Sequence, residues 1–207
     1  RKMGIFSPLP AVPSICLGTP DISLYEMTGA MSTYANKGIF VQPLFVTRIE
    51  DKHGNVIAQF VPHQDEAMSE ETAYMMIGLM KGVVESGTGS RLRGKYGLTN
   101  PIAGKTGTTQ SNSDGWFMGL TPDLVTGVWV GGDDRTIRFR STSLGQGANM
   151  ALPIWALYMK KIYADSQLQL TRGDFERPEG LKEDYFNCAT FDPNNPGENA
   201  TDDNDKY

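Results

Sequence analysis

Three short segments at residues 101–109, 115–120 and 124–131 constrain the fold of this chain more than any other feature of its sequence. Each is rich in apolar or β-branched residues, and only a few turn-forming residues separate one from the next. This pattern predicts three consecutive β-strands. Because parallel neighbours need a long crossover connection, strands joined this closely must pair antiparallel. The third segment is apolar at successive positions, which is typical of a strand covered on both faces.

Two amphipathic helices are predicted before these strands. The first covers residues 21–37, where Ser23 stands three residues before a glutamate as in a capping box and Gly38 ends the helix. The second opens at Ser69, which is followed by two acidic residues, and stops at Gly87. The apolar stripe of the second helix consists of Tyr74, Ile77, Met80 and Val84.

A third helix is predicted after the strands, over residues 148–164, with Pro153 in its first turn, where proline is tolerated. Its expected buried stripe consists of Trp155, Tyr158, Met159 and Ile162. Between the first two helices, residues 43–50 and 55–61 predict a β-hairpin. The elements together predict an α+β fold, in which an antiparallel sheet is flanked by helices.

Charge is distributed unevenly along the 207 residues. Residues 1–170 hold fifteen Lys and Arg against fourteen Asp and Glu, whereas residues 171–207 hold four against ten. The first part is predicted to be the folded domain and the second a flexible, acidic C-terminal extension with no core of its own. No basic stripe indicates nucleic-acid binding, and no apolar run approaches the ~20 residues that a transmembrane helix needs.

Cysteine and histidine positions predict no metal site. Cys16 lies in an apolar stretch and is expected to be a small buried core residue, with a Cys16–Cys188 disulfide as the alternative. His53 and His63 are ten residues apart and lack metal-ligand spacing. His53 falls in a turn-like sequence, so we interpret it as a solvated loop residue.

Residues 105–109 (Lys-Thr-Gly-Thr-Thr) lie in the first predicted strand and carry the clearest chemistry of the chain. A peptide substrate can pair with the edge of such a strand, and Gly107 removes the side chain where the two backbones approach. The hydroxyls of Thr106 and Thr108 are suited to bind a terminal carboxylate, and Lys105 supplies a fixed positive charge. Alternatively, this is only a polar sheet edge on which the lysine discourages aggregation.

The setting of this tripeptide resembles a known family. The penicillin-recognising serine acyltransferases combine three signatures, Ser-x-x-Lys, Ser-x-Asn and Lys-Thr-Gly, and this chain carries the third. From about residue 4 to about residue 160, the order of its segments is similar to that in the transpeptidase domain of a bifunctional class A penicillin-binding protein. Further segments carrying the resemblance are residues 6–18, the helix over 22–38, the Gly-Thr-Gly turn within 83–91 and the strand over 124–131.

The resemblance implies a partial penicillin-binding-protein or β-lactamase-like transpeptidase domain. Its implied activity is DD-transpeptidation, which cross-links peptidoglycan stem peptides through an acyl-serine intermediate and which β-lactams block by imitating D-Ala-D-Ala. It further implies a preceding glycosyltransferase domain, a membrane anchor outside this chain and a location on the outer, periplasmic face of the cytoplasmic membrane. No metal or organic cofactor is implied.

By the same resemblance, Lys105 and the backbone N–H of Thr108 are catalytic, the latter as an oxyanion-hole donor. The implied substrate-binding residues are Thr106, Gly107, Thr108, Thr109, Gly87, Thr88 and Gly89. A plain helix stop also explains the two glycines of the Gly-Thr-Gly turn. Both interpretations of that turn stay open at the level of sequence.

The other two signatures are absent from the sequence. No serine stands three residues before any lysine, and none stands two residues before any asparagine. We therefore expect the nucleophile and its base lysine to lie upstream of Arg1. On this expectation the chain is the C-terminal half of a catalytic domain, is inactive alone, and has the missing N-terminal half as its direct partner.

Other functions explain the pattern less well. Lys105 and its neighbours look like the end of a phosphate-binding loop, but that loop requires a glycine where Thr99 stands. Neither histidine has the setting of a catalytic triad, and there is no Gly-x-Ser-x-Gly elbow. The remaining alternatives are a β-lactamase or DD-carboxypeptidase relative and a non-catalytic binding module. An upstream Ser-x-x-Lys would separate an enzyme from such a module.

Overall fold

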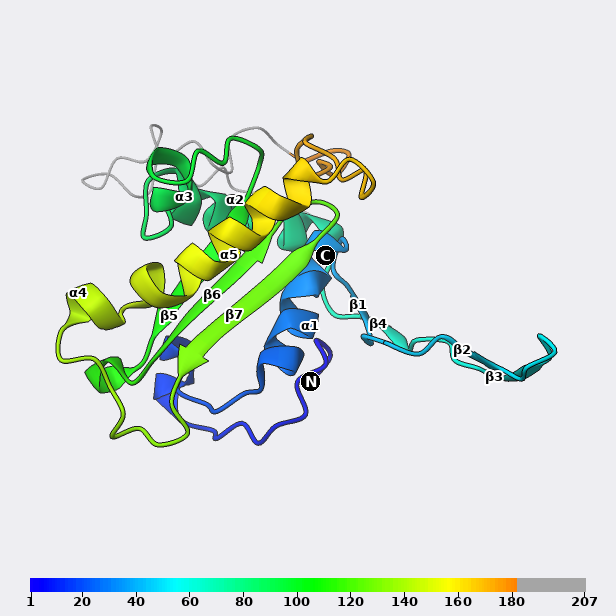
Figure 1. Ribbon diagram of the computed structural model, residues 1–207, viewed down its shortest axis with the longest axis horizontal. Helices are drawn as coiled ribbons and strands as arrows, with labels where there is room; N and C mark the ends of the chain where they lie inside the picture. Colours follow the sequence, from blue (N-terminus) through cyan, green and yellow to red (C-terminus); the bar gives the residue numbers. More distant parts are fainter. Residues whose placement is uncertain (182–207) are drawn as a thin grey trace, which may run out of the picture.

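The computed structural model describes residues 1–181, and a three-stranded antiparallel sheet forms the centre of this part of the chain (Figure 1). Its strands are β5 (Ala103–Thr108), β6 (Asp114–Leu120) and β7 (Val125–Gly131), in the order β5-β6-β7. Each strand pairs in register with the next across a short connection. The predicted α+β fold and the antiparallel order are therefore confirmed.

Helices cover both faces of the sheet. These are α1 (Leu24–Ala35), α2 (Glu70–Glu85) and α5 (Gly147–Ala164). The ring of Trp155 in α5 lies against Gly119 on one face, and Leu24 and Thr28 of α1 lie against Gly127 on the other. Helix α2 runs beside β5 (Figure 1). The central strand β6 is thus buried over most of its length, whereas β7 is only half-buried and its Trp129 is 39% exposed, so β7 is not fully covered on both faces as its apolar run predicts.

The predicted caps of the first two helices are present. At the start of α1, the Ser23 side chain accepts a hydrogen bond from the Glu26 amide, and the Glu26 carboxylate accepts one from the Ser23 amide. At its end, Gly38 has a left-handed φ of 85° and its amide donates to the Thr33 carbonyl. The side chain of Ser69 likewise caps α2 by accepting from the amide of Thr72.

Helix α5 differs from its sequence prediction in two respects. It begins at Gly147, so Pro153 lies inside the helix and not in its first turn. The proline removes one helical hydrogen bond there, a cost that the burial of the surrounding face offsets. The sheet-facing side is centred on Leu152, Trp155 and Met159, which are fully buried. Tyr158 falls outside this face and is 42% exposed, so its prediction as a buried residue is wrong.

The main core lies between α5 and the sheet. The rings of Phe117 and Trp155 meet edge to face with centroids 5.2 Å apart. An added Cβ on Gly119 would stand 2.3 Å from the Trp155 ring, so this approach of helix to strand requires glycine. Around the aromatic pair, the buried members of the cluster include Val84, Leu92, Leu98, Ile102, Ala151, Leu152, Ala156 and Met159.

A two-stranded ribbon projects from the body (Figure 1). Its outer part is the predicted hairpin, formed by β2 (Arg48–Glu50) and β3 (Val56–Gln59), whose strands are shorter than predicted. Its inner part pairs β1 (Ile39–Val41) with β4 (Gln64–Glu66), which the sequence analysis did not predict. The carboxylate of Asp51 fixes the turn by accepting hydrogen bonds from the amides of His53 and Asn55.

The smaller elements are two 3-10 turns, η1 (Pro13–Leu17) and η2 (Gln110–Asn112), and two short helices, α3 (Arg91–Gly94) and α4 (Thr142–Gly145). All residues of η1 are exposed, including Cys16, so the prediction that Cys16 is buried is wrong. The apolar residues around Cys16 form a short surface turn, and none of them is buried within the described residues 1–181. The proposed partner, Cys188, lies outside the described residues.

The C-terminal segment that precedes residue 182 is attached to the body. Phe175 is 6% exposed and packs against the cluster that contains Ile77 and Met80 of α2. Lys81 of α2 forms an ion pair with Asp174, with an Nζ–Oδ2 distance of 2.6 Å. The predicted extension from residue 171 therefore begins with a docked segment, and the rest of it lies outside the described residues.

Glu26 fastens the N-terminal segment to α1. Its carboxylate accepts hydrogen bonds from the Ser7 hydroxyl at 2.5 Å and from the amides of Phe6 and Ser7 at 2.8 Å each. These bonds, that of the Ser7 side chain first, lower the pKa of Glu26 from 4.5 to about 2. A lowered pKa in the folded state means that the carboxylate stabilises the fold above pH 4.5, and that this contribution disappears as the pH falls through about 2.

We therefore predict that Glu26→Gln removes part of the acid sensitivity of the fold. The unfolding midpoint of the wild-type chain should fall more steeply between pH 4.5 and 2 than that of the variant. Urea unfolding measured across this pH range tests the prediction, with the exposed Glu66→Gln on β4 as the matched control. If the unfolding midpoints of wild type and Glu26→Gln changed in parallel with pH, the hydrogen bonds of the Glu26 carboxylate would not stabilise the fold.

Candidate active site

The Lys-Thr-Gly-Thr sequence lies on β5, at one edge of the central sheet. Within residues 1–181, β5 has a strand partner on one side only, which is β6. The side chain of Thr106 is buried, whereas Lys105 and Thr108 are exposed. The other edge of β5 can therefore accept an extended peptide as an additional strand.

Alternation along β5 separates the lysine from the two threonines. Lys105 is paired with Met118, on the face that α1 covers, whereas Thr106 is paired with Phe117, on the face that α5 covers. The amine of Lys105 donates a hydrogen bond to the carbonyl of Thr106, with an N–O distance of 2.6 Å. The predicted site residues thus meet only along the edge of the strand and not on one face.

The Gly-Thr-Gly turn lies beside this strand. The hydroxyl oxygens of Thr88 and Thr106 are 2.6 Å apart, which joins the turn after α2 to the middle of β5. An added Cβ on Gly87 would lie 2.9 Å from the Val83 carbonyl, and the Gly89 amide donates to that same oxygen. The end of the helix therefore accounts for both glycines, and the threonine between them is the residue that contacts the lysine strand.

Thr109 holds the turn between β5 and β6. Its hydroxyl lies 2.9 Å from that of Ser113 and accepts a hydrogen bond from the amide of Asp114 at 3.0 Å. The Thr109 amide donates in turn to the Asp114 carbonyl. Among the predicted substrate-binding residues, Thr109 is therefore the one whose polar groups are most fully engaged within the protein.

Sequence reasoning missed one residue at this site. The amide of Gly147, at the start of α5, donates a hydrogen bond to the hydroxyl of Thr108 at 3.0 Å. The helix reaches the strands because Gly115 and Gly147 meet without side chains, and Gly147 also lies against the carbonyl of Gly107. A glycine in a strand and another at a helix start are a sequence signal for such an approach, although they do not show which ones come together.

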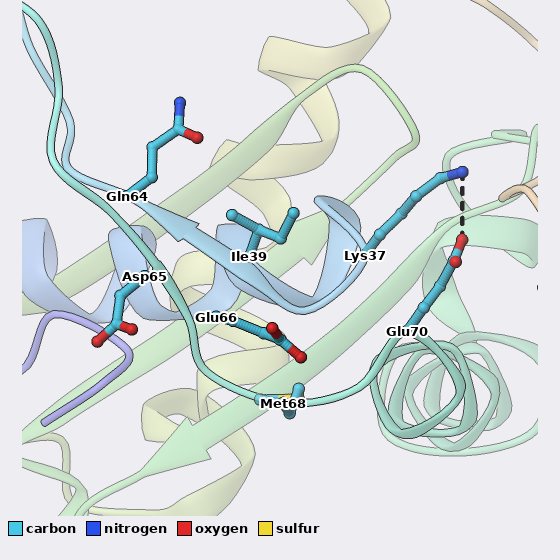
Figure 2. A pocket seen from close by; sticks show the side chains of 7 residues that line it. All are labelled: Lys37, Ile39, Gln64, Asp65, Glu66, Met68 and Glu70. Carbon is cyan, nitrogen blue, oxygen red and sulfur yellow. Dashed lines mark ion pairs between the residues drawn. The ribbon is translucent and has the colours of Figure 1, made fainter.

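Two hollows in the surface lie away from the lysine strand. Figure 2 shows the first, beside β1 and β4, with the ion pair between Lys37 and Glu70, which are 3.2 Å apart. Lys37 forms a second ion pair, at 2.8 Å, with Glu176, which the figure does not draw. The second is an open groove of about 1010 Å³ between α1, the start of β7 and the base of the ribbon. None of the predicted site residues lines either hollow.

Within residues 1–181, no group of three or more His, Cys, Asp or Glu side chains could hold a metal ion. No helix in the same range has both the length and the apolar character needed to cross a membrane.

Comparison with known proteins identifies the family to which the chain belongs. Residues 14–134 match the family model of the penicillin binding protein transpeptidase domain. This match covers more than half of the 207 residues, so the chain belongs to that family. The family match includes α1, α2 and the whole of the sheet that carries Lys105.

Several relatives within this family are named penicillin-binding protein 1A. The chain is 35% identical to penicillin-binding protein 1A of Aquifex aeolicus over 176 residues, and this aligned stretch covers 82% of the chain and 23% of the relative. It is 38% identical over 166 residues to penicillin-binding protein 1A of Neisseria meningitidis, covering 77% of this chain and 20% of the relative. The chain therefore spans less than a quarter of the length of these relatives.

Solved structures agree with this assignment. The penicillin-binding protein PonA1 from Mycobacterium tuberculosis superposes with a TM-score of 0.69 at 25% identity, over 87% of this chain and 50% of that one. Penicillin-binding protein 1A from Haemophilus influenzae gives a TM-score of 0.67 at 22% identity, over 76% of this chain and 28% of that one. The second similarity supports the fold alone.

Proposed function

We propose that this chain supplies the Lys-Thr-Gly half of the active site of a peptidoglycan DD-transpeptidase. The observation that carries the proposal is the exposed edge of β5, where Lys105 and Thr108 lie within a strand that can take a peptide partner. Family membership and relatives named penicillin-binding protein 1A support the assignment. A solved PonA1 structure, 25% identical to this chain, contains penicillin V, which supports β-lactam binding.

The proposed reaction proceeds in two acyl transfers. A serine hydroxyl attacks the carbonyl of the penultimate D-alanine of a donor stem peptide, and the terminal D-alanine leaves with a proton on its amine. An amine of a neighbouring stem peptide then attacks the acyl-serine and releases the serine. Neither Ser-x-x-Lys nor Ser-x-Asn occurs in residues 1–207, so we propose that another segment of the complete protein supplies both.

In this reaction, β5 and the adjacent Gly-Thr-Gly turn bind the substrate and stabilise the oxyanion. The stem peptide lies along the outer edge of β5, and its terminal carboxylate is held by Thr108 with Lys105 as a nearby positive charge. Thr88, bonded to Thr106, contributes to the same wall of the site. The backbone N–H of Thr108 stabilises the oxyanion, and such a donor is typically worth roughly 3–4 kcal/mol in the transition state.

The setting of the complete protein follows from the same proposal. Its substrate is a cell-wall polymer, so the reaction takes place on the extracytoplasmic side of the cytoplasmic membrane. We propose that a glycosyltransferase domain and a membrane anchor belong to parts of the protein outside this chain.

Labelling with a fluorescent penicillin tests the proposal. The complete protein should form a covalent adduct that survives denaturation and that maps to a serine outside residues 1–207. The present chain alone should remain unlabelled, because it lacks the serine that carries the acyl group. An adduct on any residue of this chain, or an unlabelled complete protein that is folded, would contradict the proposal.

A further inference from the structure

The start of α5 is capped by the lysine strand. The N-cap residue of α5, Gln146, makes no side-chain cap bond, and the amide of Gly147 donates instead to the hydroxyl oxygen of Thr108. A helix start leaves such amides without partners inside the helix, so the strand satisfies one of them. An added Cβ on Gly147 would lie 2.3 Å from the Gly107 carbonyl oxygen, so this contact requires glycine.

This hydrogen bond restricts the role of the Thr108 hydroxyl. A hydroxyl has one proton to donate and two lone pairs that can accept, and the Gly147 amide takes one of these lone pairs. Because the Gly147 amide already approaches that oxygen, the hydroxyl proton is directed away from α5. Thr108 is exposed, so the proton is available to a bound acceptor. The amide also lies at the positive end of an 18-residue helix, which strengthens the hydroxyl as a donor.

We propose that the Gly147 amide is a positioning group that makes Thr108 a committed hydrogen-bond donor. The site thereby favours a substrate that ends in a carboxylate over the same substrate with that group esterified. A hydrogen bond to a charged acceptor is stronger than one to a neutral acceptor, which is the source of the selectivity. The inference rests on the proposed function, in which Thr108 faces the terminal carboxylate.

The test removes the hydrogen-bond donor at Gly147, and the comparison of two substrates separates this loss from the weaker acceptor strength of the Gln146 carbonyl, which bonds the amides of Asn149 and Met150. In the complete protein, the peptide N–H of Gly147 is replaced by an ester oxygen, which deletes the donor and adds no Cβ. Acylation rates are then measured with a penicillin and with its methyl ester. The penicillin should react about tenfold more slowly or worse, and the methyl ester should be little affected. In a protein that also carries Thr108→Val, the ester replacement at Gly147 should not slow acylation by penicillin any further. In a protein that carries Thr108→Ser, which keeps the hydroxyl, the replacement should still slow it.

The role of Gly147 would be overturned if the ester replacement slowed acylation by the penicillin and by its methyl ester equally, or if it still slowed acylation in Thr108→Val.

A second measurement needs no backbone replacement. On penicillin binding, the amide-proton resonance of Gly147 should shift in wild type and Thr108→Ser, and stay in place in Thr108→Val. A resonance that stays in place in wild type would also overturn the inference. Failure of penicillin to label the wild-type protein would instead remove the proposed function itself.

Discussion

Replacing Lys105 by alanine in the complete protein is expected to slow acylation by a β-lactam about 10²- to 10³-fold, the range typical for loss of one electrostatic group at a reacting centre. Lys105 is exposed on the edge strand and its amine contacts only the backbone of Thr106 in the described structure. The substitution removes no buried contact, so the fold should be retained. Its effect should therefore appear in the acylation rate and not in the yield of folded protein.

The matched control is Lys52→Ala, which removes an exposed lysine at the tip of the ribbon. Stopped-flow or gel-based acylation kinetics of the three proteins provide the comparison, with circular dichroism as the check on folding. Lys52→Ala should react at the wild-type rate. Unchanged kinetics in a folded Lys105→Ala protein would remove Lys105 from the site and would favour the alternative that it only protects a sheet edge.

Trp155→Ala is expected to cost about 3–5 kcal/mol of the free energy of unfolding. Trp155 is fully buried, forms an edge-to-face pair with Phe117, and covers Gly119. Within the described residues, its indole N–H has no hydrogen-bond partner, so the loss is one of packing. The cavity would open where α5 rests on β6, the strand that pairs with the lysine strand.

Guanidinium unfolding followed by far-ultraviolet circular dichroism measures this cost without relying on tryptophan fluorescence. Leu157→Ala on the same helix is the control, because Leu157 is 56% exposed and should change stability by well under 1 kcal/mol. The loss in free energy of unfolding for Trp155→Phe should lie between those of the two variants, since Trp155→Phe keeps an aromatic ring against Phe117. Equal midpoints for Trp155→Ala and Leu157→Ala would show that α5 does not hold the sheet as described.

Features that depend on neighbouring residues could be predicted from sequence. The Ser23 cap and the turn at Gly38 involve residues within one helix, and the order β5-β6-β7 follows from connections too short for any other pairing. These elements are local, so their residue types alone determine much of their geometry. The Lys-Thr-Gly motif could be placed on a strand for the same reason.

Features that depend on residues far apart in the chain could not be predicted from the sequence. The contact between Thr88 and Thr106 and the bond from Gly147 to Thr108 join parts of the chain that only the packing of α2 and α5 brings together. The docking of Phe175 was hidden because the surrounding composition is acidic and polar. In α5, the periodic pattern identified a helix but misplaced Tyr158, since the sheet selects which side is buried.

A crystal structure of the complete protein acylated by a penicillin would show whether the outer edge of β5 holds the substrate. We expect the acyl group to lie along β5, with its carboxylate within hydrogen-bond distance of the Thr108 hydroxyl and its carbonyl oxygen within reach of the Thr108 amide. An acyl group bound away from β5, for example in the groove between α1 and β7, would show that this edge is not the substrate site.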